Sequence, residues 1–302
     1  MYRQIKMELK NCINQMEFKF IFSILWCISI GGFIINCFMY KNSYYQFLRA
    51  ANENFILVST STRAIIIVLA LFFPLLAMSI YSGSFKKEER SNLTQLIILR
   101  TSKKRYIWSK AIAIFIITFL SFLIPLLINQ LLCYLTFPIE GFDNRWALPN
   151  YDLIRRYENT DLFDFFRIQY PFIYNLLYIL IYSTLGGLIA LLAYGVNFVQ
   201  KFKSIKELQV NIIIFVIFML SSFSSQILKI PIMDFLSYTQ AGKKANFIGL
   251  VLYCLFIFIC AITLIIRGCG KYWIYVNIVN TFFRTFYTVL LLANLSHSFG
   301  VI

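Results

Sequence analysis

The chain has 302 residues, of which 60% are hydrophobic and 18% aromatic, while only 14% are Asp, Glu, Lys or Arg. With a mean hydropathy of +0.73, this composition excludes a soluble globular domain and is typical of an integral membrane protein. The formal net charge is +15, but the basic residues lie between apolar runs and form no single patch. They indicate membrane topology and contact with anionic lipid headgroups, and no nucleic-acid binding is predicted.

Seven cysteines are scattered along the chain, mostly within apolar stretches, and none has CxxC spacing. The only histidine is His297. Disulfide frameworks and zinc sites need closer groupings of these residues, so neither is predicted and no metal site is assigned.

Residues 1–19 form the first predicted element. Apolar residues recur there at spacings of three and four, and polar residues take the opposite face. The apolar positions are Tyr2, Ile5, Leu9, Cys12 and Met16, and the polar positions are Arg3, Lys6, Lys10, Asn14 and Glu17. This pattern predicts an amphipathic helix that lies in the membrane interface. The alternative is a frayed cytoplasmic tail whose periodicity is accidental.

A six-span membrane domain is predicted over 20–267, as an all-α fold. The spans are expected at 20–39, 64–81, 111–136, 172–199, 211–228 and 247–266. Pro74 and Pro125 are expected to kink the second and third spans. Small residues in the fourth span are expected to allow close helix packing, in this chain or between two copies. They are Ser183, Gly186, Gly187 and Ala190.

Three segments lie mainly outside the six predicted spans. The segment 138–170, with six acidic residues and four arginines, is expected outside the membrane, as a solvated loop or a partly helical cap. The stretch 226–246 is expected to dip back into the outer leaflet. The tail 268–302 is predicted to be membrane-associated, and within it 285–302 is either a short seventh span or a helix packed against the membrane or a partner.

The distribution of Lys and Arg predicts the orientation. Seventeen of these residues fall in segments that share a side with the N-terminus, and ten fall in segments on the other side. Because positive charge concentrates on the cytoplasmic side, the N-terminus and the end of the sixth span are predicted to be cytoplasmic.

The connector from Gly83 to Lys110 carries eight Lys or Arg residues between two apolar runs. A charged start leads through Gln95, Leu96 and Ile97 to Ser102 and Lys103. This order resembles the cytoplasmic coupling segment of type-2 ABC transporter permeases. Four positions depart from that pattern, with Ser91, Asn92, Arg100 and Ser109 where Gly, Thr, Pro and Gly are usual.

The resemblance implies a permease subunit in the plasma membrane of a bacterial cell, with a coupling helix between spans 2 and 3 in the segment 84–105. A separate cytoplasmic ATPase, in two copies, would bind that segment and would carry ATP and Mg. Six spans make half of such a transporter, so a second copy or a homologous permease is expected. The residues expected to contact the ATPase are Glu89, Arg90, Gln95, Leu96, Ile97 and Lys103.

No phosphate-binding loop of the form GxxxxGK[ST] occurs in the chain, so no cofactor and no enzymatic activity are assigned to it. An apolar, aromatic interior suits an amphipathic cargo such as an antimicrobial peptide, a lantibiotic or a lipid. Two other classes stay open. One is a membrane-embedded lipid-processing enzyme that uses external acids such as Asp161 and Asp164, and the other is a sensor or scaffold subunit that binds the ATPase without moving cargo.

Overall fold

The computed structural model of the chain describes residues 1–42, 44, 48–91, 93–94, 97, 101–139, 162–199, 205–227, 234–241 and 245–270. Across these ranges the regular structure consists of helices. They are α1 (Tyr2–Asn14), α2 (Met16–Met39), α3 (Arg63–Ser79), α4 (Ser84–Arg90), α6 (Lys103–Thr136), α8 (Asp164–Gln169), α9 (Pro171–Val196), α10 (Glu207–Ile227), α11 (Phe235–Thr239) and α12 (Phe247–Gly270).

Six segments within the described ranges are helical, long and apolar enough to cross a membrane. They are Met16–Met39, Arg63–Arg90, Lys103–Thr136, Pro171–Val196, Glu207–Ile227 and Phe247–Cys269. Each overlaps one of the predicted spans, so over the described residues the prediction of an all-α fold with six helices that could cross a membrane is confirmed.

The two largest differences from the sequence-based boundaries lie at the end of α1 and at the start of α6. The helix expected over 1–19 ends at Asn14, because Gln15 is extended with φ −70° and ψ 138°, and α2 begins at Met16. The third span begins at Lys103 and not after Lys110. Lys and Arg are good helix formers, so they continue a helix beyond the apolar stretch that hydropathy detects.

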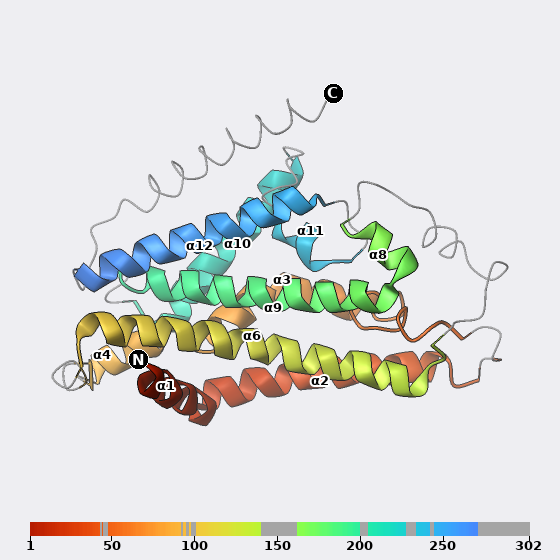
Figure 1. Cartoon of the computed structure of the whole chain (residues 1–302), viewed down its shortest axis with the longest axis horizontal. Helices are drawn as coiled ribbons and strands as arrows, with labels where there is room; N and C mark the ends of the chain where they lie inside the picture. Colours follow the sequence, from red (N-terminus) through yellow and green to blue (C-terminus); the bar gives the residue numbers. More distant parts are fainter. Residues whose placement is uncertain are drawn as a thin grey trace.

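Helix α9 lies at the centre of the bundle and packs against α3, α6 and α12 (Figure 1). A Cβ atom added at Gly187 would lie 2.7 Å from Cδ2 of Phe115, and one added at Gly186 would lie 3.0 Å from Cδ2 of Phe122. Ser183 and Ala190 are fully buried on the same helix. These small residues therefore admit aromatic rings of the same chain, and this face of α9 is not available to a second copy.

Both prolines expected to kink a span lie inside helices, Pro74 in α3 and Pro125 in α6. Each is buried. Proline removes one backbone N–H and with it one hydrogen bond of the helix, so a nearby carbonyl needs another partner.

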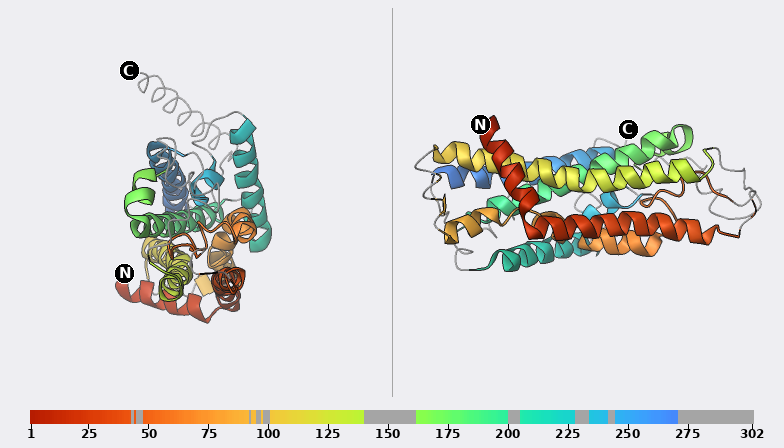
Figure 2. Two further views of the ribbon diagram at one scale, coloured as in Figure 1. Left: turned by 90° about the vertical axis from the view of Figure 1, so that its right-hand side faces the viewer. Right: turned by 90° about the horizontal axis from the view of Figure 1, so that it is seen from below.

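The two ends of the bundle differ in the elements that they carry (Figure 1). Helices α1 and α4, the start of α6 and the end of α12 lie at one end, which we call the α4 end. Helix α8 and the segment 48–62 lie towards the other, the α8 end. Figure 2 shows α1 lengthwise in the view that shows α2 and α9 nearly end-on, so α1 runs across the direction of the spans.

Three predicted regions lie partly outside the described residues. The external segment 138–170 is described only at its two ends, where α8 precedes α9. The stretch 226–246 is described mainly through α11, which packs against α3, α9 and α10. The tail beyond 270, including the possible seventh span, lies outside the described residues.

Candidate functional site at the α4 end

Helix α4 is short, with the sequence SFKKEER, and it is held to the bundle by an aromatic side chain. Phe85 is fully buried. Its ring centroid lies 4.6 Å from that of Phe198, 6.4 Å from that of Tyr106 and 6.5 Å from that of Tyr194. The ring therefore joins α4 to α6 and to the end of α9, which fixes one face of the helix against the core.

A group of five side chains, which we call the charged network, lies beneath α4. Its members are Glu8, Tyr81, Glu88, Tyr106 and Lys110. The side chain of Lys110 is fully buried, and its Nζ lies 2.5 Å from Oε1 of Glu88 and 3.5 Å from Oε2 of Glu8. A buried ammonium group is tolerated only when carboxylates compensate its charge. Lys110 of α6 thereby ties α4 to α1.

Two tyrosine hydroxyls complete the charged network. Tyr81 donates a hydrogen bond of 2.7 Å to Oε2 of Glu8, and Tyr106 donates to Oε2 of Glu88. The ammonium group of Lys110 donates to the Tyr106 hydroxyl at 3.2 Å. It also lies 5.0 Å from the centroid of the Tyr106 ring, within the range of a cation–π contact. Each carboxylate thus has both an ion-pair partner and a hydroxyl donor.

The electrostatic setting of Glu8 follows from its burial. Burial raises the pKa of its carboxyl above the ordinary value, while Lys110 opposes the increase, Glu88 adds to it and the Tyr81 hydrogen bond opposes it. Desolvation is the largest of these effects. Glu8 is the member of the charged network that α1 contributes. A change in the position of α1 would therefore change the burial of this carboxyl and with it the pKa.

The opposite side of α4 contacts α10 and Ile205, two residues before α10 begins. Nη2 of Arg90 donates to the carbonyl of Ile205 at 3.0 Å, and Nη1 lies 3.6 Å from Oε1 of Glu207. Nζ of Lys86 donates to the same carbonyl at 3.4 Å. Helix α4 is therefore linked to the start of α10 as well as to α1 and α6.

A further ion pair joins Lys87 of α4 to Glu17 at the start of α2. Both side chains are partly exposed to solvent, with exposed fractions of 38% and 52%. Exposed pairs of this kind stabilise weakly. The buried attachments of α4 are therefore Phe85, Lys86 and the charged network, whereas the contacts of Lys87 and Arg90 are partly exposed.

The residues predicted to contact an ATPase are only partly described. Glu89 is half-buried in α4 and Arg90 is exposed next to it. Ile97 is half-buried against the hydrophobic core, and Lys103 is half-buried at the first turn of α6. Gln95 and Leu96 lie outside the described residues. The structure thus brings Glu89 and Arg90 together on one short helix that is linked to α1, α6 and α10.

The sequence reasoning missed Glu8 and Glu88 as partners of Lys110. One signal was present, because Glu8 lies four residues before Cys12 and three after Ile5, on the face assigned as apolar. A carboxylate on an otherwise apolar helix face indicates a buried partner of opposite charge.

At the α8 end, neutral amides take the place that charges have at the α4 end. We call Asn36, Asn52, Asn129, Gln130 and Asn175 the amide network. Nδ2 of Asn175 donates to the carbonyl of Asn52 at 2.9 Å and to Oε1 of Gln130 at 3.1 Å, and Nδ2 of Asn36 donates to a loop carbonyl at 2.6 Å. All five side chains are buried. The amide network therefore holds the segment 48–62 against three spans.

Asn129 also joins α6 to α2 near the proline of α6. Its Nδ2 donates to the carbonyl of Ser29 at 2.8 Å, and its Oδ1 accepts from the backbone N–H of Ile56 at 3.0 Å. In return, Oγ of Ser29 donates to the carbonyl of Pro125 at 2.5 Å. These bonds cross between helices in a buried region, where unpaired polar groups would be costly.

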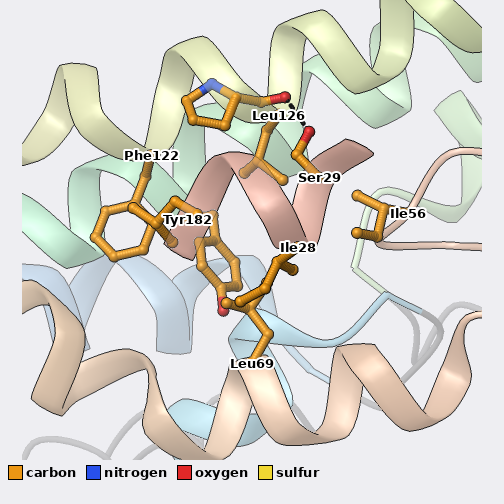
Figure 3. A pocket seen from close by; sticks show the side chains of 9 residues that line it. Ile28, Ser29, Ile56, Leu69, Phe122, Leu126 and Tyr182 are labelled. Carbon is orange, nitrogen blue, oxygen red and sulfur yellow. Dashed lines mark hydrogen bonds between the residues drawn. The ribbon is translucent and has the colours of Figure 1, made fainter. Parts of the chain in front are cut away.

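A small pocket lies between α2, α3, α6 and α9, next to this link (Figure 3). It is lined by Leu25, Ile28, Ser29, Ile56, Leu69, Phe122, Pro125, Leu126 and Tyr182. The space open to the centre of a water-sized sphere is about 10 Å³, which is room for about one water molecule. The pocket as it stands does not have the size of a cargo site.

Asp234 is the buried carboxylate of the segment before α11. It accepts hydrogen bonds from Ser222, from Nε2 of Gln226 at 3.2 Å, from the backbone N–H of Leu236 at 3.1 Å and from Oγ of Ser237 at 2.7 Å. Its role in this arrangement is to cap α11 and attach it to α10. Of the external acids, Asp161 and the side chain of Asp164 lie outside the described residues. Within the described ranges, no three His, Cys, Asp or Glu side chains lie close enough to hold a metal ion.

Comparisons with protein-family models, with curated proteins and with solved structures found no match for the chain.

Proposed function

We propose that the chain is the membrane permease subunit of an ABC transporter, powered by a separate cytoplasmic ATPase that binds the segment 84–105. The observation that carries the proposal is the attachment of α4. This short charged helix, at the end of the second candidate span, is linked to α6 and α1 through Lys110 and to α10 through Arg90. A force applied to α4 would therefore act on several spans at once.

In this proposal the α4 end faces the cytoplasm of a bacterial cell, as the Lys and Arg distribution predicts. Helix α1 is the interfacial helix, and its direction across the spans supports that role (Figure 2). A second permease, either another copy or a homologue, completes the transporter. Because the small residues of α9 are occupied within the chain, the second permease would contact other helices.

The cargo is proposed to be an amphipathic molecule such as an antimicrobial peptide, a lantibiotic or a lipid, moved outward. The exposed surfaces of the candidate spans carry many large apolar side chains, which suits such a molecule better than a sugar or an ion. The ATPase subunits would bind ATP and Mg and would supply the energy.

The test is purification of the full chain in mild detergent, with identification of copurifying proteins by mass spectrometry and an ATPase assay. We expect a soluble ATPase to copurify. The ATPase should no longer copurify with a variant that carries Glu89→Lys, Arg90→Glu and Leu96→Asp. Lys41→Glu with Arg63→Glu is the control, since both residues are exposed, Lys41 on the connection after α2 and Arg63 at the first position of α3.

The outcomes separate the three function classes. Copurification together with cargo-stimulated ATP hydrolysis supports the permease. An ATPase that binds without any stimulation by candidate cargo favours a sensor or scaffold subunit. A chain that purifies alone and without ATPase activity contradicts the proposal, and a lipid-processing activity dependent on Asp161 and Asp164 then becomes the hypothesis to test.

A further inference from the structure

Helix α1 presents three different faces. The inner face carries Glu8 and Cys12, which are 7% and 0% exposed. A second face is basic and exposed, with Arg3, Lys6 and Lys10 at i, i+3 and i+7. Since these spacings bring residues to one side of a helix, the three charges form a single stripe.

The third face is apolar and also exposed. Tyr2 and Ile13 are 82% and 49% exposed. Ile13 lies three residues after Lys10, and residues at this spacing are neighbours on a helix surface. The exposed apolar residues therefore border the basic stripe. The only acidic residue of α1 is Glu8, which faces inward.

We propose that this outer surface of α1, formed by Tyr2, Arg3, Lys6, Lys10 and Ile13, docks on anionic phospholipid headgroups and that the charged network transmits this docking to α4. The occupant follows from charge and shape. A helix that lies across the spans, with an apolar stripe beside an uninterrupted basic stripe, fits the boundary between acyl chains and negatively charged headgroups.

The path of transmission is short. Glu8 on the inner face of α1 accepts from Tyr81 at 2.7 Å and lies 3.5 Å from Nζ of Lys110. Lys110 in turn lies 2.5 Å from Glu88 of α4. When headgroups hold α1 in place, Glu8 stays seated against Lys110, and Lys110 keeps Glu88 and therefore α4 in position. The assignment of α4 as the coupling segment rests on the proposed function, whereas the docking of α1 does not.

The experiment measures hydrogen–deuterium exchange of the full chain in nanodiscs of phosphatidylcholine alone and of phosphatidylcholine with phosphatidylglycerol. The anionic lipid should slow amide exchange in both α1 and α4. Each Lys or Arg beside an anionic surface contributes about fivefold to its attraction. Lys6→Gln with Lys10→Gln should therefore remove most of the lipid effect in both helices.

The matched control is Lys104→Gln with Arg105→Gln, which removes two exposed positive charges from the same end of the bundle but from α6. It should keep the lipid effect. Glu8→Gln should keep the effect in α1 and lose it in α4, which separates docking from transmission. Tyr81→Phe, which removes only the hydroxyl donor, should weaken the effect in α4 in the same way.

Three results would overturn the inference. Equal exchange of α1 in the two bilayers excludes docking on anionic lipid. An equal loss of the lipid effect in the control variant shows that general positive charge, and not α1, is responsible. An unchanged response of α4 in Glu8→Gln excludes the charged network as the path. None of these readouts uses an ATPase, so failure of the proposed function would leave the test of docking intact.

Discussion

The two ends of the bundle bury polar side chains by different means. At the α4 end, one fully buried lysine is compensated by two carboxylates and two tyrosine hydroxyls. At the α8 end, neutral amides bind loop carbonyls and one another. Removal of one member of a buried charged cluster is strongly destabilising, because it leaves an uncompensated charge. An amide loses only hydrogen bonds, so its removal costs less and does not respond to pH. The α4 end is thus the end that can respond to a change of charge or position.

The largest predicted effect comes from Lys110→Met. Among the described residues it removes the one cation paired with Glu8 and Glu88, which leaves a buried and a half-buried carboxylate without an ion-pair partner, and the expected loss of unfolding free energy is about 3–5 kcal/mol. Thermal or denaturant unfolding in detergent measures it. Adding Glu8→Gln and Glu88→Gln to Lys110→Met should recover much of the lost unfolding free energy. An unchanged unfolding midpoint for Lys110→Met alone would refute the assignment of the charged network.

At the other end, Asn129→Ala should cost less. It removes the donor to the Ser29 carbonyl and the acceptor for the Ile56 N–H, and the expected loss is about 1–3 kcal/mol in the same assay. Thr136→Ala on α6 is the control, because that exposed hydroxyl bonds only to its own helix. If Asn129→Ala destabilised the protein as much as Lys110→Met, the distinction between the two ends would fail.

The two ends of the bundle should also differ in how the unfolding free energy depends on pH. The pKa of Glu8 in the folded chain is raised above 4.5, its value without the fold, chiefly by burial. The folded state therefore binds the proton more tightly. This contribution to stability is fully present below pH 4.5 and is lost as the pH rises through the raised pKa.

Unfolding of the full chain at a series of pH values from 4 upward measures this effect. Glu8→Gln should flatten the decline in stability with rising pH. Asn129→Ala should shift the whole curve and leave its slope unchanged, because amides do not titrate in this range. A slope that is the same in Glu8→Gln and in the unaltered chain would contradict the prediction.

The smallest effect is expected from Lys87→Gln. Its ion pair with Glu17 is partly exposed, so its loss should change the unfolding free energy by about 0–1 kcal/mol, and less at high salt. Measurement at low and high ionic strength checks both statements. A loss comparable to that of Lys110→Met would mean that exposed charges, and not the buried ones, hold α4.

Much of the fold could be predicted from the sequence because hydropathy depends on local composition. All six spans follow from apolar runs such as the one that contains Pro125. The start of α6 at Lys103 could not be found in this way, since a helix can continue through charged residues where hydropathy falls. The inner contacts of Gly186 and Gly187 could be anticipated as close packing, but not their partners, which depend on how α9 meets α6.

The candidate site was less predictable. Lys110 and Glu88 both lie in the connector from Gly83 to Lys110. Glu8 is far from both in the sequence, so no local pattern predicts its contact with Lys110. Their contact depends on α1 crossing the bundle at the place where α4 leaves it. The amides of the α8 end could likewise be seen as polar residues in a span, as with Asn129 and Gln130, but their partners lie in a loop without periodicity.

The pairing of Glu8 with Lys110 also bears on how the chain is made. Helix α1 is synthesised before α2 and α3, so two candidate spans are made before Lys110 follows. Until the third hydrophobic helix has left the translocation machinery, the carboxylate of α1 has no lysine to meet. A nascent chain that ends before that point would carry an uncompensated acid on its N-terminal helix. The ion pair between Glu8 and Lys110 can therefore form only after the third hydrophobic helix has been synthesised.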